Sequence, residues 1–352
     1  MILEKEQWRR FIKGFDFIGG LIGFENNRYC FILEEKKRNV HRDPPPCIRI
    51  LYARMERPLE QRLYRLDYPE LEYPMSAYVT TNGVHEFITG NMQGGLVSYR
   101  YLDDGIVLDD EDEDTPGIVT QWAELRKAPV KRLRRVQGKL YAVCADRRIL
   151  ERRGVGQWTE LPGLERPKER MENTHYPALS FGFDDMDAFD PDDIYAIGGK
   201  GDVWHYNGSS WRQCHFPSQK LIETVCCGGD GKVYIGGGGG VNGGIWIGRD
   251  DQWEQVPGTE YANPDDIVWF AGKAWASAIG QLSVITPDGM TVALTPDYVQ
   301  ATTGHISVSE DGTKMLAAGN RGASVFDGQE WQLLIDTFLL SEGEEDDDDD
   351  DE

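Results

Sequence analysis

Residues Ile194–Trp211 read IYAIGGKGDVWHYNGSSW, and this stretch decides the fold class. A strand-forming run, Ile194–Ile197, ends at a glycine pair, and a second run, Asp202–Tyr206, ends at Asn207-Gly208. We expect Asn207-Gly208 to form a two-residue hairpin turn, because both residue types tolerate positive φ. Trp211 then opens a third run. The stretch predicts short antiparallel strands joined by tight turns.

The same pattern recurs along the chain. Five anchor positions, each aromatic or apolar, lie 54, 39, 41 and 41 residues apart, and they are Tyr141, Tyr195, Tyr234, Trp275 and Leu316. After most anchors a turn and a tryptophan follow 15 to 19 residues later, as at Trp158, Trp211, Trp253 and Trp331. Weaker copies lie upstream at Arg28–Phe31 and Ala77–Val79. The repeat therefore predicts seven units.

A unit of about 40 residues with several short strands has the size of a four-stranded propeller blade. A small twisted sheet cannot bury its own faces, but radial stacking against its neighbours buries both. The recurrent Trp and Tyr side chains supply large apolar areas between blades. We therefore expect an all-β protein with a single β-propeller, built from seven blades of four antiparallel strands.

Two segments, Asp192–Gly198 and Gly201–Trp211, resemble the blade repeat of bacterial WD40-like and YVTN-like propellers. Shortened corners such as Asp327–Trp331 are similar to the Asp-box of sialidase-type propellers, although the full box is absent. The resemblance covers residues 138–334 well and residues 20–137 poorly. It implies a fold and no particular activity, because propellers host enzymes, scaffolds and inhibitors.

The expected organisation has three parts. Residues 1–20 form an N-terminal arm, in which Trp8, Phe11 and Phe15 fall at helical spacing and cover core or a propeller edge. Residues 21–340 form the propeller, and residues 341–352 form a disordered acidic tail. We expect strands from both termini to share the closing blade, because closure removes open sheet edges.

The chain is strongly acidic, with a formal net charge of −23. Ten of these charges lie in residues 342–352, which leaves −13 for the body (−23 + 10). Such a charge disfavours binding to duplex nucleic acid or to an anionic membrane, because both require clustered Lys and Arg. It favours either a basic protein partner or simply solubility.

No stretch approaches 18 consecutive apolar residues, and the N-terminus has no apolar run typical of a secretory signal. The six cysteines show no disulfide spacing, and Cys226 and Cys227 are adjacent. We therefore expect a cytoplasmic protein with reduced cysteines that is monomeric in its free state.

Two acidic clusters are the candidate partner-binding site. They form an expected rim that consists of Asp109, Asp110, Glu111, Asp112, Glu113, Asp114, Asp184, Asp185, Asp187 and Asp190. Neither cluster has the spacing of a calcium-binding loop, so we predict no metal. A basic run at 126–135 either contacts phosphate or nucleic acid or, as we favour in so acidic a chain, pairs with neighbouring acidic loops or repels a wrong partner.

Motifs for catalysis or cofactor binding are weak. The glycine run at 236–243 contains a formal G-x-G-x-x-G, but the following residues, Ile245–Ile247, predict a strand instead of the helix that phosphate binding needs. His205 occupies a repeated strand position and is expected to pack structurally. No arginine cluster on the central axis is identifiable. We predict no catalytic residues and no cofactor.

Three hypotheses remain open. The preferred one is a non-enzymatic, protein-binding propeller, in its sharper form an inhibitor or immunity-type protein that neutralises a basic partner such as a nuclease toxin. The second is an enzyme of the glycosidase, sialidase or lactonase type, with carboxylates at the inner strands. The third is an assembly scaffold with several weak partners.

Overall fold

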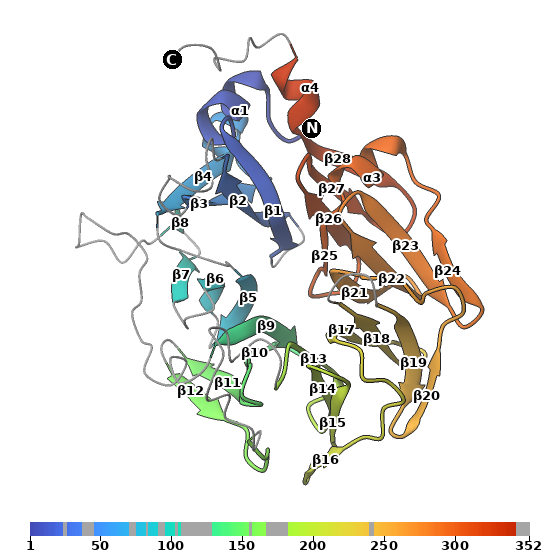
Figure 1. Ribbon diagram of the computed structural model, residues 1–352. Coiled ribbons are helices and arrows are strands. Elements are labelled where there is room, and N and C mark those ends of the chain that lie inside the picture. The colour runs from blue at the N-terminus through green and yellow to red at the C-terminus, as the bar shows by residue number, and fades with distance from the viewer. Residues whose placement is uncertain are drawn as a thin grey trace, which may run out of the picture.

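The computed structural model describes residues 1–342 apart from ten segments, which are 24–26, 37–45, 70–74, 82–83, 91–95, 103–104, 107–128, 155–156, 167–181 and 239–242. Hydrogen bonds group the described strands into seven antiparallel sheets of four, each built from strands in chain order. Figure 1 shows the sheets following one another around a ring. We number them blades 1 to 7. The predicted single all-β propeller is confirmed.

The first three blades come from the N-terminal part of the chain. Blade 1 contains β1 (Phe15–Ile22), β2 (Arg28–Glu35), β3 (Ile48–Arg54) and β4 (Leu63–Tyr68). Blade 2 contains β5 (Met75–Thr81), β6 (Val84–Gly90), β7 (Leu96–Leu102) and β8 (Gly105–Ile106). Blade 3 contains β9 (Val130–Val136), β10 (Lys139–Cys144), β11 (Ile149–Gly154) and β12 (Gln157–Glu160). Because β8 has two residues, blade 2 is incomplete, and the other six sheets are regular blades.

The remaining four blades are compact. Blade 4 contains β13 (Asp185–Asp190), β14 (Asp193–Gly198), β15 (Asp202–Tyr206) and β16 (Trp211–Gln213). Blade 5 contains β17 (Ile222–Cys227), β18 (Val233–Gly237), β19 (Ile245–Arg249) and β20 (Gln252–Gln255). Blade 6 contains β21 (Asp266–Phe270), β22 (Lys273–Ala278), β23 (Gln281–Thr286) and β24 (Gly289–Val292). Blade 7 contains β25 (His305–Val308), β26 (Met315–Gly319), β27 (Gly322–Phe326) and β28 (Trp331–Asp336). The glycine run at 236–243 begins within β18, and residues 239–242 of it lie outside the described residues. Ile245–Ile247 form part of strand β19, as predicted.

The anchors of the sequence repeat occupy equivalent places. Tyr141, Tyr195, Tyr234, Trp275 and Leu316 all lie on the second strand of their blade and are buried. The weaker copy at Arg28–Phe31 also begins a second strand, β2. The copy at Ala77–Val79 does not, because these residues belong to β5, the first strand of blade 2. The predicted register was therefore wrong in that one unit.

The recurrent tryptophans join neighbouring blades, as predicted. Trp253, near the start of β20 in blade 5, packs edge-on against Tyr195 of blade 4, with ring centroids 6.3 Å apart. It also contacts Phe216 at 5.5 Å. Trp211 of blade 4 belongs to a buried cluster with Tyr141 of blade 3. Each aromatic ring buries a large apolar area in a place that a single sheet would leave exposed.

The turn at Asn207-Gly208 differs from the prediction. Tyr206 pairs with Trp211, so the connection has four residues, and of the first two only Gly208 has positive φ. The Asn207 side chain instead accepts hydrogen bonds from the backbone N–H groups of Ser209 and Ser210. This local bond stabilises a longer loop without requiring Asn207 to adopt positive φ.

Two-residue turns with positive φ at both positions occur between the first and second strands of blades 3 and 6. They are Gln137-Gly138, with φ of 50° and 77°, and Ala271-Gly272, with φ of 48° and 74°. This is the φ pattern that a type I′ turn requires.

The ring closes differently from the expected shared blade. Blade 1 contains only N-terminal strands and blade 7 only C-terminal ones. Strand β1 packs directly against β25 and β26, and a Cβ atom at Gly20 would lie only 3.1 Å from the Cβ of Ala318. The termini still meet, because the Ile2 N–H donates to the Leu334 carbonyl of β28 at 2.8 Å. Closure therefore depends on face-to-face packing at the seam.

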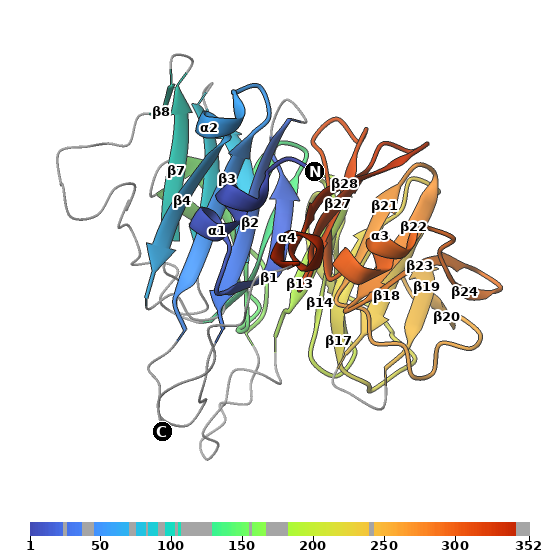
Figure 2. The same ribbon diagram turned by 90° about the horizontal axis from the view of Figure 1, so that it is seen from above.

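Four short helices complete the described chain, and they are α1 (Lys5–Phe11), α2 (Leu59–Arg62), α3 (Asp297–Thr302) and α4 (Thr337–Ser341). Figures 1 and 2 show α1 and α4 beside each other at the seam between the first and last blades. Trp8 and Phe11 are buried there, as predicted. The arm is shorter than residues 1–20, because β1 begins at Phe15. Residues 343–352 of the acidic tail lie outside the described residues.

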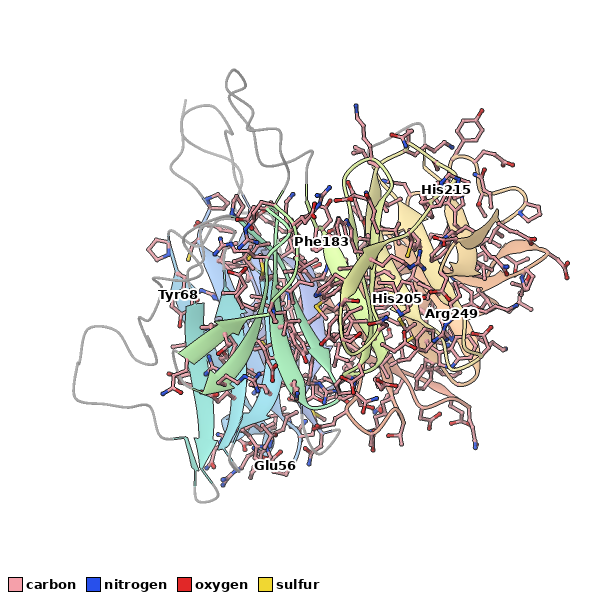
Figure 3. All side chains as sticks on the ribbon, turned by 90° about the horizontal axis from the view of Figure 1, so that it is seen from below. Glu56, Tyr68, Phe183, His205, His215 and Arg249 are labelled. Carbon is pink, nitrogen blue, oxygen red and sulfur yellow. The ribbon has the colours of Figure 1, made fainter. Side chains whose placement is uncertain are left out.

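The ring has two faces that carry different connections. The hairpin face carries the turns between first and second and between third and fourth strands. The inter-blade face carries the turns between second and third strands and the connections from one blade to the next. In Figure 3, Glu56 lies at the hairpin face and His215 at the inter-blade face. No helix in the described part of the chain is long and apolar enough to cross a membrane.

Candidate functional site in the central channel

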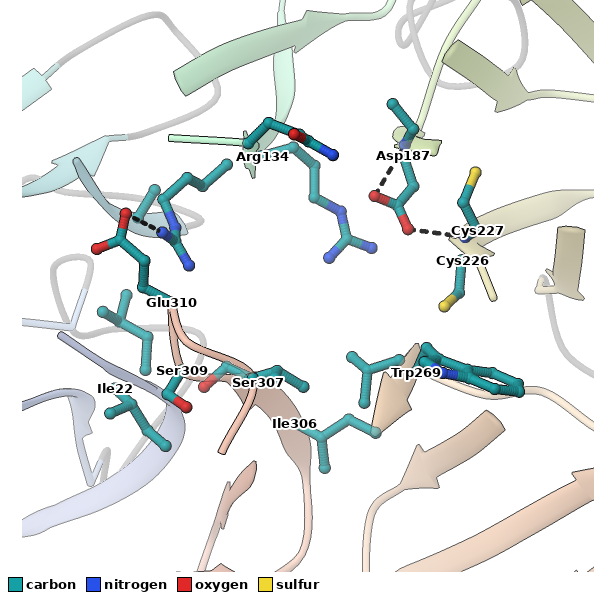
Figure 4. Close-up of a pocket in the computed structure, with 18 of the residues that line it drawn as sticks. Ile22, Arg134, Asp187, Cys226, Cys227, Trp269, Ile306, Ser307, Ser309 and Glu310 are labelled. Atoms are coloured by element: carbon teal, nitrogen blue, oxygen red, sulfur yellow. Dashed lines mark hydrogen bonds and ion pairs between the residues drawn. The ribbon is translucent and has the colours of Figure 1, made fainter. Parts of the chain in front are cut away.

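The central channel is lined by the innermost strands of all seven blades, which are β1, β5, β9, β13, β17, β21 and β25. At the hairpin face it widens into a cavity of about 570 Å³, which we call the channel mouth (Figure 4). A second cavity of about 280 Å³ lies further toward the inter-blade face. Leu133 and Arg134 of β9 line both cavities, so the two are continuous.

Strand β9 contains most of the basic run 126–135, whose first three residues lie outside the described part. Arg132 and Arg134 are two residues apart, so both side chains project from the same side of the strand, toward the channel. Arg134 donates to both carboxylate oxygens of Asp185, at 2.8 and 2.6 Å. Arg132 reaches across the channel and donates to Asp266 of blade 6. The run therefore pairs with acidic residues, the alternative favoured above.

Asp266 is the centre of a network that spans the channel. Its carboxylate accepts hydrogen bonds from Arg132, from the His305 imidazole at 2.7 Å and from the Ile306 N–H at 3.2 Å. Burial raises the pKa of Asp266, but His305 and Arg132 lower it by more, so the pKa lies well below its usual range. The same contact raises the pKa of His305. The network thus connects blades 3, 6 and 7 through charged groups.

Side chains of the inner strands also bind the backbone of the next blade. Asp185 of blade 4 accepts from Val225 N–H at 3.1 Å, and Thr224 of blade 5 accepts from Ile267 N–H at 3.1 Å. Asp266 makes the same contact with blade 7, through Ile306. These three side chains form a ladder from blade 4 to blade 7, which we call the inter-blade ladder. Each bond satisfies a backbone donor that the sheet leaves unpaired.

The structure does not support a solvated rim at the second acidic cluster. Asp185 is fully buried, and Asp184 is bound by Lys131 at 3.2 Å and by the Gly199 N–H at 3.1 Å. Asp187 lines the channel mouth and accepts from the Cys227 N–H at 2.8 Å. Asp190 alone of these four is exposed, at the last position of β13. Asp185 is therefore buried instead of forming part of an exposed rim, and the partner-binding role of the other three acids stays a prediction.

The first acidic cluster, residues 109–114, lies outside the described residues. It belongs to the connection between β8, which ends at Ile106, and β9, which begins at Val130. Both ends of this connection lie at the inter-blade face. The partner-binding role of the first cluster stays a prediction.

The channel mouth combines one perturbed carboxyl group with a buried thiol, that of Cys226, and a half-buried one, that of Cys227 (Figure 4). Burial raises the pKa of Asp187 to about 6, although Arg134 and the Cys227 N–H act in the opposite direction. Burial also raises the pKa values of Cys226 and Cys227 well above their usual range, so both thiols are protonated at neutral pH and are poor nucleophiles. Among the described residues, no group of His, Cys, Asp or Glu is arranged to hold a metal ion.

His205 has the structural environment that its repeat position predicted. Its ring stacks on Tyr195 with centroids 4.4 Å apart, and its two nitrogens contact Asp193 at 2.8 Å and Asp250 at 2.9 Å. Arg249 of blade 5 also pairs with Asp193, and Figure 3 shows it beside His205. These contacts connect blades 4 and 5 at the hairpin face.

The channel arginines are the residues that sequence reasoning missed. Arg132 and Arg134 do form an arginine pair near the central axis, although none was identifiable beforehand. The available signal was their spacing of two within a run bounded by Val130 and Val136, which places both arginines on the same face of a strand. The high charge of this run favoured a loop or surface interpretation instead.

No family model matches the chain. Among solved structures, the chain is similar to a catalytically inactive variant of virginiamycin B lyase from Staphylococcus aureus, with a TM-score of 0.57 and 10% identity over 92% of this chain and 97% of that one. It is also similar to the WD40 propeller domain of Doa1, with a TM-score of 0.53 and 9% identity over 89% and 96% of the two chains. At such identities the similarity shows the fold alone, and it confirms the resemblance to WD40-like propellers.

One curated relative is similar in sequence. The chain is 26% identical over 198 residues to the immune protein Tsi7 of Pseudomonas aeruginosa. The match covers 56% of this chain and 61% of that protein, which is less than two thirds of the relative's length. The sequence relationship is thus to an immune protein, whereas the fold is shared with lyases and WD40 domains alike.

Proposed function

We propose that this chain is an immunity-type protein that binds a toxin protein and neutralises it. The observation that carries the proposal is the 26% identity over 198 residues to the immune protein Tsi7. The net charge of −23 supports a basic partner, because opposite charge accelerates encounter and disfavours wrong partners. A nuclease toxin fits this chemistry, since such an enzyme must itself attract phosphate.

The chemistry of the channel supports a binding protein over an enzyme. Arg132 and Arg134 are held by Asp185 and Asp266, and these acids also bind the backbone of the next blade. Groups engaged in this way stabilise the ring and are not available to bind a substrate. We further propose that the protein acts in the cytoplasm and is a monomer until it meets its partner.

The test begins with a tagged chain used to capture its partner from native lysate at low and at high salt. We expect one stoichiometric basic protein that resists release by salt. Co-expression of the chain with that protein should then restore growth to cells that the protein alone inhibits. Failure of the chain to restore growth would contradict the immunity role.

An enzyme remains the second candidate, on one observation: Asp187 has a pKa of about 6 and lines a cavity of about 570 Å³. A carboxyl group with such a pKa suits general acid–base catalysis near neutral pH. A screen of sugar and lactone substrates, with and without divalent metal, tests this candidate. Turnover that Asp187→Asn abolishes would establish it, and no turnover would remove it.

A further inference from the structure

Large exposed apolar side chains gather on one face of the ring. Of the described residues, seven such side chains are exposed, and they are Met1, Tyr261, Ile279, Val292, Leu294, Phe338 and Leu339. All except Met1 lie in connections, turns or strand ends of the inter-blade face, or in α4, which follows the last strand there. Singly exposed apolar residues need no explanation, but a concentration on one face marks an interaction surface.

One of the seven lines a pocket on blade 6, and three more lie close to its lining residues in the chain or in the sheet. Tyr261, in the connection from blade 5, is 79% exposed and lines a cavity of about 400 Å³. Ile279, in the turn after Ala278, is 74% exposed, and Leu294, just beyond β24, is fully exposed. Val292 pairs across the sheet with Ser283, which also lines the cavity. We call these four residues and this cavity the blade 6 patch.

The pocket has the shape and lining to accept an apolar side chain. Its walls include the small residues Ala276 and Ala278, together with Pro264 and Met290. Small side chains on β22 leave room next to the sheet, while Met290 adapts to the shape of a ligand. A central pocket of this kind with a surrounding polar rim is the arrangement found around interface hot spots.

The rim of the blade 6 patch is acidic. Glu260 precedes Tyr261, Asp265 follows Pro264, and Asp297 begins α3 just after Leu294. The one lysine that reaches this surface, within the described residues, is Lys220, and its ammonium group donates to the carbonyls of Gly243 and Glu260. Glu260 and Asp297 are exposed, whereas Asp265 is half-buried and lies near His305 and Arg132 of the channel network. Two exposed carboxylates against one ammonium group leave a negative rim, which complements a basic partner.

We propose that the blade 6 patch is the surface that docks the protein partner, which inserts an apolar side chain into the pocket and places basic side chains against its rim. This inference rests on the proposed immunity function and assigns its contact surface. A stable complex buries about 800 Å² on each partner, so the patch is the centre of a contact that extends over the neighbouring inter-blade loops.

The experiment compares substitutions at one exposed position. Ile279→Arg removes an apolar contact and adds a charge that repels a basic partner, whereas Ile279→Glu removes the same contact and adds an attractive charge. Gln329→Arg places the same positive charge on the hairpin face of blade 7, in an exposed turn, and is the matched control. Binding of the partner captured by the wild-type chain is measured by calorimetry at two salt concentrations, beside the growth-rescue assay. Circular dichroism verifies the fold of each variant.

We expect Ile279→Arg to weaken binding at least tenfold and Gln329→Arg to change it less than twofold. We expect Ile279→Glu to fall between them and to lose less at low salt, because screening is then weaker. If Ile279→Arg and Leu294→Arg both bind as tightly as wild type, the docking surface is refuted while the immunity function stands. If the wild-type chain neither captures a partner nor restores growth, both proposals fail.

Discussion

In blades 4 to 7, neighbouring inner strands are joined by the inter-blade ladder, whereas blades 1 to 3 are joined by contacts that differ at each junction. The ladder uses a side-chain oxygen at equivalent positions, from Asp185, Thr224 and Asp266. Between blades 1 and 2, the rings of Tyr52 and Phe87 pack with centroids 5.4 Å apart. Between blades 2 and 3, Arg152 forms an ion pair with Glu86 at 2.9 Å.

This difference explains why one half of the chain shows its repeat and the other does not. A hydrogen bond to the backbone of the next blade needs a short acceptor at the same register in every unit, so the register is kept, although the acceptor is Asp185, Thr224 or Asp266. A ring contact or an ion pair suits only its own junction and leaves the other positions free to change. The ladder also predicts that its acids are costlier to replace than equally buried pairs elsewhere.

The largest effect is expected for Asp185→Ala. Asp185 is fully buried and accepts from Arg134 and from the Val225 N–H. Its removal leaves a partly buried guanidinium and an unpaired backbone donor, which costs about 4 kcal/mol of the free energy of unfolding. Urea denaturation followed by fluorescence measures the loss. Asp190→Ala, at the exposed last position of the same strand, is the control and should cost less than about 0.5 kcal/mol. Equal midpoints for the two variants would contradict the ladder.

A smaller loss of stability, which a second substitution should recover, is expected at the junction of blades 2 and 3. The side chains of Arg152 and Glu86 are only 3% and 1% exposed, so Glu86→Leu alone should cost about 3 kcal/mol by leaving a buried charge. Adding Arg152→Met should recover stability to within about 1 kcal/mol of wild type, because apolar residues replace the whole pair.

The corresponding double variant in the ladder, Asp185→Leu with Arg134→Met, should not recover. The Val225 N–H remains without its acceptor whatever replaces the two charges. The two double-mutant cycles, measured by the same urea titration, therefore separate the two kinds of junction. Equal recovery in both cycles would show that the backbone bond contributes nothing.

The sequence predicted the propeller well in the blades where the repeated side chains themselves pack between neighbouring blades. The anchors Tyr195 and Tyr234 and the tryptophans at the fourth strands are visible because their side chains fill equivalent spaces between blades. It failed at the seam, because Trp8, Phe11 and Phe15 share a helical spacing although Phe15 already belongs to β1. Only Ile12, Lys13 and Gly14 separate the helix from the strand, and the apolar spacing of four continues across them, so periodicity alone misplaced the boundary.

The candidate site was harder to predict than the fold. From the sequence, Asp184 and Asp185 were expected to lie in an exposed acidic rim. The residues around them do not show that Lys131 and Arg134, about 50 residues earlier, are their partners. Only the ring places β9 beside β13. Charge runs in a propeller therefore identify a surface only after the inner strands are known, and the blade 6 patch, made of scattered apolar residues, has no local signature at all.

The smallest expected change in the free energy of unfolding is at Asp187. Replacement of Asp187 should stabilise the protein, whereas replacement of a ladder acid should destabilise it. The pKa of Asp187 is about 6 in the folded chain, above the value of about 3.9 for an unfolded Asp, so the folded state holds this proton more strongly. Stability therefore falls as pH rises from about 4 to 6 and stays reduced above that range. Asp187→Asn removes the buried charge while its amide oxygen still accepts from the Cys227 N–H.

We expect Asp187→Asn to stabilise the protein by about 1–2 kcal/mol at pH 8, since its partial exposure discounts the full effect of the shift, and to have little effect at pH 4. Urea midpoints at the two pH values measure the difference. Equal stabilisation at both values would assign the gain to packing instead of ionisation. Destabilisation at pH 8 would mean that Asp187 acts as the ladder acids do, through its attraction to Arg134, and that the channel mouth belongs to the same charged network.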